Sequence, residues 1–250
     1  MSSSVSEPRI LVVNPNSSTV ITEALQRNLE PETGSGLRRP FQGVYLTGPA
    51  SAPPSINNAI DAVNSAATTF TKIIEHELRT EEESVAADAF LVCCFSNHPL
   101  AGMLRQQFPT KPCMHILEAA VLHAIPLCNR FGVITTGADA VPDIDRGVRD
   151  VLGANSYRYV GTLATGLGVV ELQTGDRVKI NAVLQDFSAR LARMGADAII
   201  LGCAGMTGME AIVRQGAQSA LPAGKRVAVI DGAKAGVQLL SGLVSSQYFG

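Results

Sequence analysis

Two cysteines of this 250-residue chain occupy matching positions, each at the end of an apolar stretch. Cys94 comes six residues after Asp88, and Cys203 comes six residues after Asp197. A helix is expected shortly after each cysteine, and the dipole and free N–H groups of a helix N-terminus would lower the pKa of a nearby thiol. Two such thiols facing across a cleft form an acid/base pair, in which a thiolate removes a proton from carbon and a thiol returns one to the opposite face.

The same cysteines have a plainer explanation, because cysteine is commonly buried and inert at the ends of strands. A lone cysteine would favour that explanation, whereas two in equivalent positions leave the structural and chemical interpretations evenly balanced. The other three are interpreted as structural: Cys93 should point to the opposite face of its strand from Cys94, and Cys113 and Cys128 lie in or beside short apolar segments. The cysteines and the four histidines show no metal-ligand spacing, so no metal site is predicted.

The elements that must position these thiols alternate along the whole chain. The expected strands are residues 9–13, 41–46, 89–93, 112–116, 131–135, 157–162, 198–201 and 226–230. The expected helices are residues 18–30, 57–83, 99–108, 117–127, 139–152, 176–194, 207–216 and 233–243, and the Pro- and Gly-rich segments 31–40 and 47–55 are expected to be surface loops. Several strands are apolar on both faces, which predicts an α/β fold with parallel strands covered by helices.

An internal repeat organises these elements. The pattern of Asp-Ala, apolar strand and Cys recurs with an offset of 109 residues, and the strand beginning at Arg9 aligns with the strand beginning at Arg130 at an offset of 121. Loops in the first half can absorb the difference of 12, although strings this short leave duplication and chance agreement both open. Two similar halves would each place a cysteine at the carboxyl edge of a sheet, where ligands bind in open α/β folds.

The repeat predicts two pseudo-symmetric subdomains, each a parallel sheet flanked by helices, with the active site in the cleft between them. Residues 9–115 plus 226–250 should form the first subdomain, which carries Cys94, and residues 116–225 the second, which carries Cys203. The strand at 226–230 finds no counterpart within the second half, so we expect it to return to the first sheet.

Composition and charge exclude several classes of protein. Apolar residues make up 46% of the chain and charged residues 17%, which is typical of a folded protein rather than a disordered one. The net charge of −2 comes without a basic block, so nucleic acid is not expected as a partner. No apolar run reaches about 18 residues, and the first ten residues lack a secretory signal, so no membrane partner is expected. Free thiols in an odd number favour a cytoplasmic protein.

Four ordered motifs carry a resemblance that spans residues 9 to 245: Ile10-Leu-Val-Val-Asn-Pro-Asn-Ser-Ser18, Cys94-Phe-Ser-Asn-His-Pro-Leu100, Phe131-Gly-Val-Ile-Thr135 and Ile200-Leu-Gly-Cys-Ala-Gly-Met206. Together they resemble the hydantoin/allantoin racemase branch of the aspartate/glutamate racemase superfamily. The resemblance implies a cofactor-independent, homo-oligomeric racemase of 5-substituted hydantoins, including allantoin. It also implies that Cys94 and Cys203 are the catalytic pair, each serving as base for one enantiomer and acid for the other.

By motif position, the substrate-binding residues implied by the resemblance are Asn14, Asn16, Ser17, Phe95, Ser96, Asn97, Thr135, Ala204 and Gly205. The chemistry agrees with that set, because the carbanion at C5 of a hydantoin delocalises into the adjacent carbonyl and its oxygen needs hydrogen-bond donors. Such a reaction needs neither a metal nor pyridoxal phosphate. The loop at 14–18 lacks the Gly-rich and Lys elements of a phosphate cradle, so no nucleotide site is predicted.

One segment departs from the family pattern, which commonly has Asp-Pro-Gly after the first catalytic motif. Here the chain has Asn97, His98 and Pro99. Asn97 and His98 at the mouth of the site could hydrogen-bond a polar substituent such as a ureido group. Alternatively, His98 is exposed to solvent and Asn97 caps the following helix.

Rival functions remain on the same scaffold. An amino-acid racemase or a maleate-type isomerase would act on an acyclic or carboxylate substrate. An arylmalonate-type decarboxylase would use one cysteine, so the second cysteine counts against it. A non-catalytic small-molecule binding protein is the alternative from another class, and the loss of either Cys94 or Cys203 would have favoured it.

Overall fold

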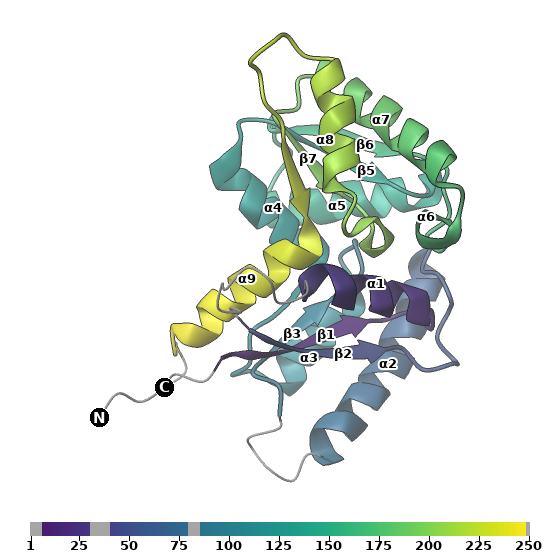
Figure 1. Ribbon diagram of the computed structural model, residues 1–250. Coiled ribbons are helices and arrows are strands. Elements are labelled where there is room, and N and C mark those ends of the chain that lie inside the picture. Colours follow the sequence, from purple (N-terminus) through teal and green to yellow (C-terminus); the bar gives the residue numbers. More distant parts are fainter. Residues whose placement is uncertain (1–6, 31–40, 80–85, 249–250) are drawn as a thin grey trace.

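The computed structural model describes residues 7–30, 41–79 and 86–248, so the loop expected at 31–40 lies outside the described residues. Within these ranges the chain forms two four-stranded parallel sheets, one above the other in Figure 1, with helices on both faces. This confirms the α/β class and the paired sheets expected from the repeat. None of the described helices is long and apolar enough to cross a membrane.

The elements of the first half alternate regularly. In chain order they are β1 (Arg9–Asn14), α1 (Thr19–Leu29), β2 (Gln42–Thr47), α2 (Ala59–Arg79), β3 (Ala89–Val92), α3 (Pro99–Gln107), β4 (Cys113–His115) and α4 (Ile116–Leu127).

The second half repeats this alternation with three short extra turns. Its elements are β5 (Phe131–Thr135), η2 (Ala138–Ala140), α5 (Val141–Leu152), β6 (Tyr159–Ala164), α6 (Glu171–Thr174), α7 (Arg177–Arg193), β7 (Ala198–Leu201), η3 (Ala204–Met206), α8 (Glu210–Ser219), β8 (Ala228–Asp231) and α9 (Gly232–Ser245).

The two sheets have the same strand order, β2-β1-β3-β4 and β6-β5-β7-β8. Their amino edges are closed by the same reciprocal contact. The N–H of Arg9 donates to Asp88 Oδ2 (2.7 Å), and the N–H of Arg130 donates to Asp197 Oδ2 (3.2 Å). Each aspartate in turn donates its own N–H to the carbonyl of its arginine. The Asp-Ala motif therefore holds the central strand pair in register in both halves, which is the structural basis of the internal repeat.

The strand expected at 226–230 does not return to the first sheet, and that prediction was wrong. It forms β8, which pairs in parallel with β7 in the register Ala198↔Ala228. The reason is that β8 does have a counterpart, the three-residue strand β4, which pairs with β3 at the same edge of the first sheet.

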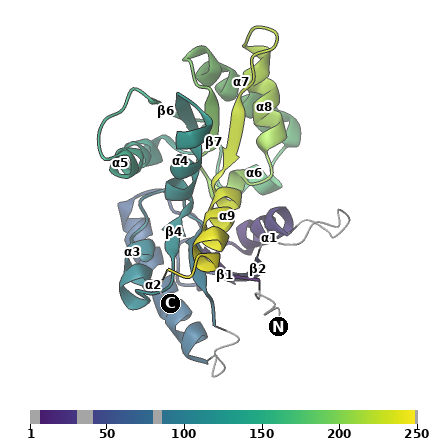
Figure 2. The same cartoon turned by 90° about the vertical axis from the view of Figure 1, so that its left-hand side faces the viewer.

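The helix after each of these edge strands crosses to the other half. Helix α4 follows β4 but packs against α5, β7 and β8, whereas α9 follows β8 but packs against β3, β4 and α4. Figures 1 and 2 show the two helices in contact at the junction of the two sheets. A Cβ on Gly236 would lie 2.4 Å from Leu91 Cδ1, so a larger residue would force the Leu91 side chain to shift where α9 lies on β3. The crossing helices hold the two halves, and hence their carboxyl edges, in a fixed relation.

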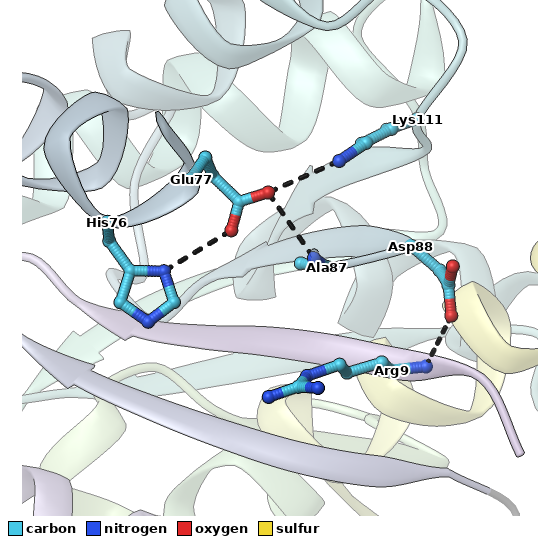
Figure 3. A network of polar contacts seen from close by, with 6 residues as sticks. All are labelled: Arg9, His76, Glu77, Ala87, Asp88 and Lys111. Carbon is cyan, nitrogen blue, oxygen red and sulfur yellow. Dashed lines mark hydrogen bonds and ion pairs between the residues drawn. The ribbon is translucent and has the colours of Figure 1, made fainter. Parts of the chain in front are cut away.

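A polar network holds the far end of the first sheet. The Glu77 carboxylate on α2, only 4% exposed, forms an ion pair with Lys111 Nζ (3.2 Å) and accepts a hydrogen bond from the N–H of Ala87 (3.3 Å). His76 Nδ1 lies 3.4 Å from the other carboxylate oxygen (Figure 3). The network fixes the end of α2 against the beginning of β3, at the amino edge of the sheet and away from both Cys94 and Cys203.

Candidate active site

Cys94 and Cys203 lie just beyond the carboxyl ends of equivalent strands. In the first half the N–H of Cys93 extends the pairing of β3 with β1 by donating to Val13 O (2.7 Å). In the second half the N–H of Gly202 donates to Ile134 O (2.7 Å) in the same way. A Cβ at position 202 would lie 2.5 Å from Val133 Cγ1, so the close approach to β5 requires glycine immediately before Cys203.

Both thiols border one pocket. The first half contributes Asn16, Ile56, Asn57, Asn58, Ala62, Cys93, Cys94, Phe95 and Ser96 to its lining. The second half contributes Thr135, Thr136, Ala140, Asp143, Ile144, Val169, Gly202, Cys203 and Ala204. A ligand in this pocket would therefore touch both halves at once, with a cysteine supplied by each.

Cys203 receives several hydrogen bonds. Its Sγ accepts from the N–H of Gly205 (3.3 Å), which makes it the cap of the short helix η3. Burial raises the pKa of the thiol to about 11, while hydrogen bonds from the N–H of Gly205, the Thr136 hydroxyl and the N–H of Met206 lower it. These three donors would stabilise a thiolate at this position.

Cys94 has a less polar environment. Its Sγ lies 3.3 Å from Ser96 Oγ. Burial raises the pKa of this thiol to about 12; the Ser96 hydroxyl opposes the rise, and the nearby Cys203 adds to it. The expectation that helix N-termini would lower both pKa values was therefore wrong, because desolvation outweighs the hydrogen bonds at each sulfur. Both thiols are neutral at pH 7 in the ligand-free protein, and Cys203 is the more acidic of the two.

Of the remaining cysteines, Cys113 and Cys128 do not line the pocket. Cys93 is 2% exposed and packs in the core, although it also borders the pocket. Cys113 is buried, and Cys128 donates its thiol to Ala124 O (3.2 Å). All three are free.

The loop after β1 presents Asn16 to the pocket, and Asn14 holds the loop in shape. The Asn14 side chain is fully buried; its Nδ2 donates to Ser18 O (2.9 Å) and Thr22 Oγ1 (3.0 Å). Asn16 lines the pocket and accepts a hydrogen bond from the N–H of Ser18 (2.9 Å). Ser17 is not among the lining residues, and its N–H donates to Pro53 O. Of these three predicted binding residues, Asn16 alone lines the pocket.

On the opposite side, Thr135 lines the pocket at the end of β5. Its hydroxyl donates to Gly202 O (3.0 Å) and so ties β5 to the turn that carries Cys203. Phe95, Ser96 and Ala204 also line the pocket as expected. Gly205 does not, but its N–H contacts the Cys203 sulfur.

His98 is neither exposed to solvent nor part of the pocket lining, so both interpretations of this residue were wrong. His98 is 1% exposed and caps α3: its Nδ1 accepts from the N–H of Leu100 (3.3 Å), and its Nε2 lies 2.9 Å from Ser65 Oγ on α2. Burial lowers the His98 pKa to about 4, so the ring is neutral. Asn97 is exposed, does not line the pocket and donates to Asp150 Oδ2 (3.1 Å). The hydrogen bonds of this segment therefore join α2, α3 and α5.

Sequence reasoning missed the pocket residues at the beginnings of α2 and α5. Asn57 and Asn58 precede α2 and were identified only as a helix start, while Asp143 lies in the first turn of α5. Thr136, next to the predicted Thr135, was also missed. The sequence does not mark Asn57, Asn58 or Asp143, because they reach the pocket only through the packing of the two halves.

The described residues offer no metal centre, because no three His, Cys, Asp or Glu side chains in 7–30, 41–79 and 86–248 are grouped closely enough to hold an ion. The polar groups that line the pocket are thiols, hydroxyls, carboxamides and one carboxylate.

Paired α/β halves with a pocket between the carboxyl edges of their sheets define the class of fold, and comparison with known proteins specifies the family. The model of the Asp/Glu/Hydantoin racemase family matches residues 10–240, and the chain belongs to this family. It is accordingly a racemase of the Asp/Glu/hydantoin superfamily.

Relatives and solved structures agree with this assignment. An uncharacterized protein of Schizosaccharomyces pombe is 36% identical over 96% of this chain and 94% of its own length. A hydantoin racemase of Rhizobium meliloti is 28% identical over 96% of this chain and 90% of its own. The structure of allantoin racemase from Pseudomonas fluorescens is similar with a TM-score of 0.75 and 26% identity, covering 95% of this chain and 91% of that one. That from Klebsiella pneumoniae, at 22% identity, shares the fold with a TM-score of 0.78 over 96% and 88% of the two chains.

Proposed function

We propose that the chain racemises 5-substituted hydantoins, allantoin among them, by transferring protons at C5 between Cys94 and Cys203 without a cofactor. The observation that carries this proposal is the composition of the pocket. Its lining brings a cysteine from each half to one space, and its described residues include no Lys, Arg or His.

The absence of a cation among these lining residues favours a neutral substrate over a carboxylate. An amino acid, maleate or an arylmalonate carries at least one carboxylate, and without a cation the desolvation of that carboxylate would have to be offset by neutral hydroxyl and carboxamide donors alone. The one formally charged lining residue is Asp143, which would repel such a substrate. A hydantoin ring is uncharged and offers both N–H donors and carbonyl acceptors to the hydroxyl and carboxamide groups present.

The proton inventory of the site fits racemisation. One thiolate takes the proton from C5, and the electron pair left on carbon delocalises into the adjacent ring carbonyl as an enolate. The opposite thiol then donates its proton to the other face of C5 and becomes the thiolate, so the pair returns to its initial charge with the roles exchanged. The Asn16 carboxamide lines the same pocket; its Oδ1 accepts from the N–H of Ser18, and its Nδ2 supplies a donor for the enolate oxygen.

Catalysis needs one of the two cysteines as a thiolate, whereas in the resting protein both are protonated. Repulsion between the two sulfurs opposes a second ionisation, so the active form carries one negative charge shared between two coupled sites. The three hydrogen-bond donors at Cys203 favour this residue as the thiolate of the active form.

Solvent deuterium exchange tests the proposal most simply. In D₂O the enzyme should exchange the C5 proton of allantoin and of alkyl hydantoins for deuterium. Polarimetry should show a loss of optical rotation at the same time. The enzyme should leave aspartate, glutamate, maleate and arylmalonates unchanged. Turnover of one of these carboxylates without any hydantoin would support a rival enzyme, and binding without exchange would support a non-catalytic protein. Cys128→Ser serves as the control thiol variant.

We also propose that the chain forms a homo-oligomer. Helix α4 exposes Leu122, Ile125 and Leu127 to 39%, 37% and 60%, and exposed apolar side chains gathered on one helix favour burial against another subunit. Light scattering should give a multiple of 26.2 kDa, and a 26.2 kDa species at micromolar concentration would contradict the proposal.

A further inference from the structure

A carboxylate and two carboxamides border the pocket from opposite halves of the molecule. Asp143 lies in the first turn of α5 in the second half, and Asn57 and Asn58 precede α2 in the first half. The mechanism above does not use any of them, since the thiols and the enolate donors lie at the strand ends. Their chemistry is complementary: the carboxylate only accepts hydrogen bonds, whereas a carboxamide also donates two.

The contacts that these side chains make within the protein leave Asp143 able to accept, and Asn57 and Asn58 able to donate, further hydrogen bonds. Asp143 Oδ1 lies 3.2 Å from an Arg146 nitrogen, but this pair is solvent-exposed, with 38% of the Asp143 side chain accessible. The carboxamide oxygens are engaged locally, Asn57 Oδ1 by the Ser55 hydroxyl (3.0 Å) and Asn58 Oδ1 by the N–H of Asp61 (2.9 Å). Among the described residues, no hydrogen bond from either Nδ2 is recorded. The free groups are thus carboxylate acceptors on one wall and amide N–H donors on the other.

We propose that Asp143 is a specificity-determining residue, which selects hydantoins whose C5 substituent carries N–H donors, and that Asn57 and Asn58 donate to the carbonyl of the same substituent. The inference rests on the proposed hydantoin racemase function and adds the class of substituent. A ureido group fits, because its two nitrogens donate toward a carboxylate while its oxygen accepts from an amide. Charge-assisted hydrogen bonds of this kind are among the stronger polar contacts in proteins.

The competing possibility is an apolar substituent. Ile56, Ile144 and Val169 also line the pocket and could hold an alkyl group. Allantoin and 5-isobutylhydantoin separate the two, because their substituents have the same number of heavy atoms and the same branching and differ in polarity. The quantity to compare is the ratio of their kcat/KM values, since a general loss of activity cancels from it.

The experiment measures this ratio for the wild-type chain, Asp143→Leu, Asp143→Asn and the matched control Asp139→Leu. Asp139 is exposed, lies four residues earlier and does not line the pocket. We expect Asp143→Leu to lower the ratio by about 10- to 100-fold, mainly through KM for allantoin, because it removes a hydrogen bond to a charged group. Asp143→Asn keeps an acceptor oxygen without the charge and should give an intermediate ratio, while Asp139→Leu should keep the wild-type ratio.

The outcomes separate this inference from the function on which it rests. If the wild-type enzyme racemises hydantoins but Asp143→Leu lowers both kcat/KM values equally or leaves the ratio unchanged, the specificity role is overturned and the racemase proposal stands. If the wild-type enzyme exchanges C5 of neither hydantoin, both proposals fall. Circular dichroism melting of each variant shows whether a loss of activity reflects unfolding.

Discussion

The resting state of the two active-site thiols makes a quantitative prediction about alkylation. Burial raises the pKa of Cys203 to about 11 and that of Cys94 to about 12. At pH 8 the thiolate fractions are therefore about 10⁻³ and 10⁻⁴. Because the thiolate is the nucleophile, the rate of iodoacetamide labelling at each residue should rise about tenfold per pH unit from pH 7 to pH 10.

The same values give the order of labelling. Cys203 has about ten times more thiolate than Cys94, but the nucleophilicity of a thiolate increases with its pKa with a slope of about 0.4 to 0.5, so the Cys94 thiolate is about threefold more reactive. The net expectation is that Cys203 is labelled about three- to fourfold faster. Cys93 and Cys113, which are 2% and 6% exposed, should react only on unfolding.

Thr136 provides a matched pair of variants for the cause of this difference. Thr136→Val removes the hydroxyl that hydrogen-bonds the Cys203 sulfur, whereas Thr136→Ser keeps it. Loss of a hydrogen bond to a charged group is worth about 1.5 kcal/mol, or roughly one pKa unit. After the gain in nucleophilicity, labelling of Cys203 at pH 8 should slow by about three- to fourfold in Thr136→Val only.

The assay quenches labelling at timed intervals and measures each cysteine-containing peptide by mass spectrometry, with Cys94 as the internal reference. A labelling rate at either cysteine that levels off below pH 8 would refute the reasoning, because it would mean that the hydrogen bonds and helix termini outweigh burial. Faster labelling of Cys94 than of Cys203 would refute the assignment of the more acidic thiol.

Two further predictions concern stability, each measured by urea denaturation. Gly236→Ala should destabilise the protein by about 1–3 kcal/mol, because the added Cβ would lie 2.4 Å from Leu91 Cδ1. Gly242→Ala in the same helix is the control: its Cβ meets nothing within 4 Å, so this variant should stabilise the protein by about 0.5–1 kcal/mol. Equal effects of the two variants would contradict the packing of α9 on β3. His98 has a pKa of about 4 in the folded state against 6.5 in the unfolded state, so between pH 6.5 and pH 4 only the unfolded chain binds a proton, and the free energy of unfolding should fall by up to about 1.4 kcal/mol per pH unit. His98→Asn keeps a capping residue at this position and should make that fall shallower. Parallel curves of stability against pH for the wild type and the variant would show that His98 is not the cause.

Particular residues show how far the sequence predicts this molecule. β3 and β7 are buried along their whole length, so their unbroken apolar residues identified them as central parallel strands, and the aligned Asp-Ala and Cys positions located both thiols. The sheet that receives β8 could not be predicted, because β4 and β8 are three and four residues long and share no obvious sequence pattern. The exchange of α4 and α9 between the halves is a tertiary choice that helical periodicity does not encode.

The candidate site was predicted in the same uneven way. Residues adjacent to the cysteines, such as Phe95, Ser96 and Ala204, were found because they share the strand ends. Asn57 and Asp143 were not, because they reach the pocket only through the packing of the two halves. The direction of the thiol pKa shifts was mispredicted for a related reason: the sequence shows nearby helix starts, but only the folded structure shows how completely the sulfurs are removed from water.

The most direct test of the central claim is the fate of the C5 proton in the single variants Cys94→Ser and Cys203→Ser. Racemisation needs deprotonation on one face and protonation on the other, and a serine hydroxyl is too weak an acid to yield a base near neutral pH. Both variants should therefore lose racemisation in both directions. At least one should still exchange C5–H of a single enantiomer for deuterium with retention, because its remaining thiolate can remove and return a proton on its own face. Full racemase activity in either variant would contradict the two-cysteine mechanism.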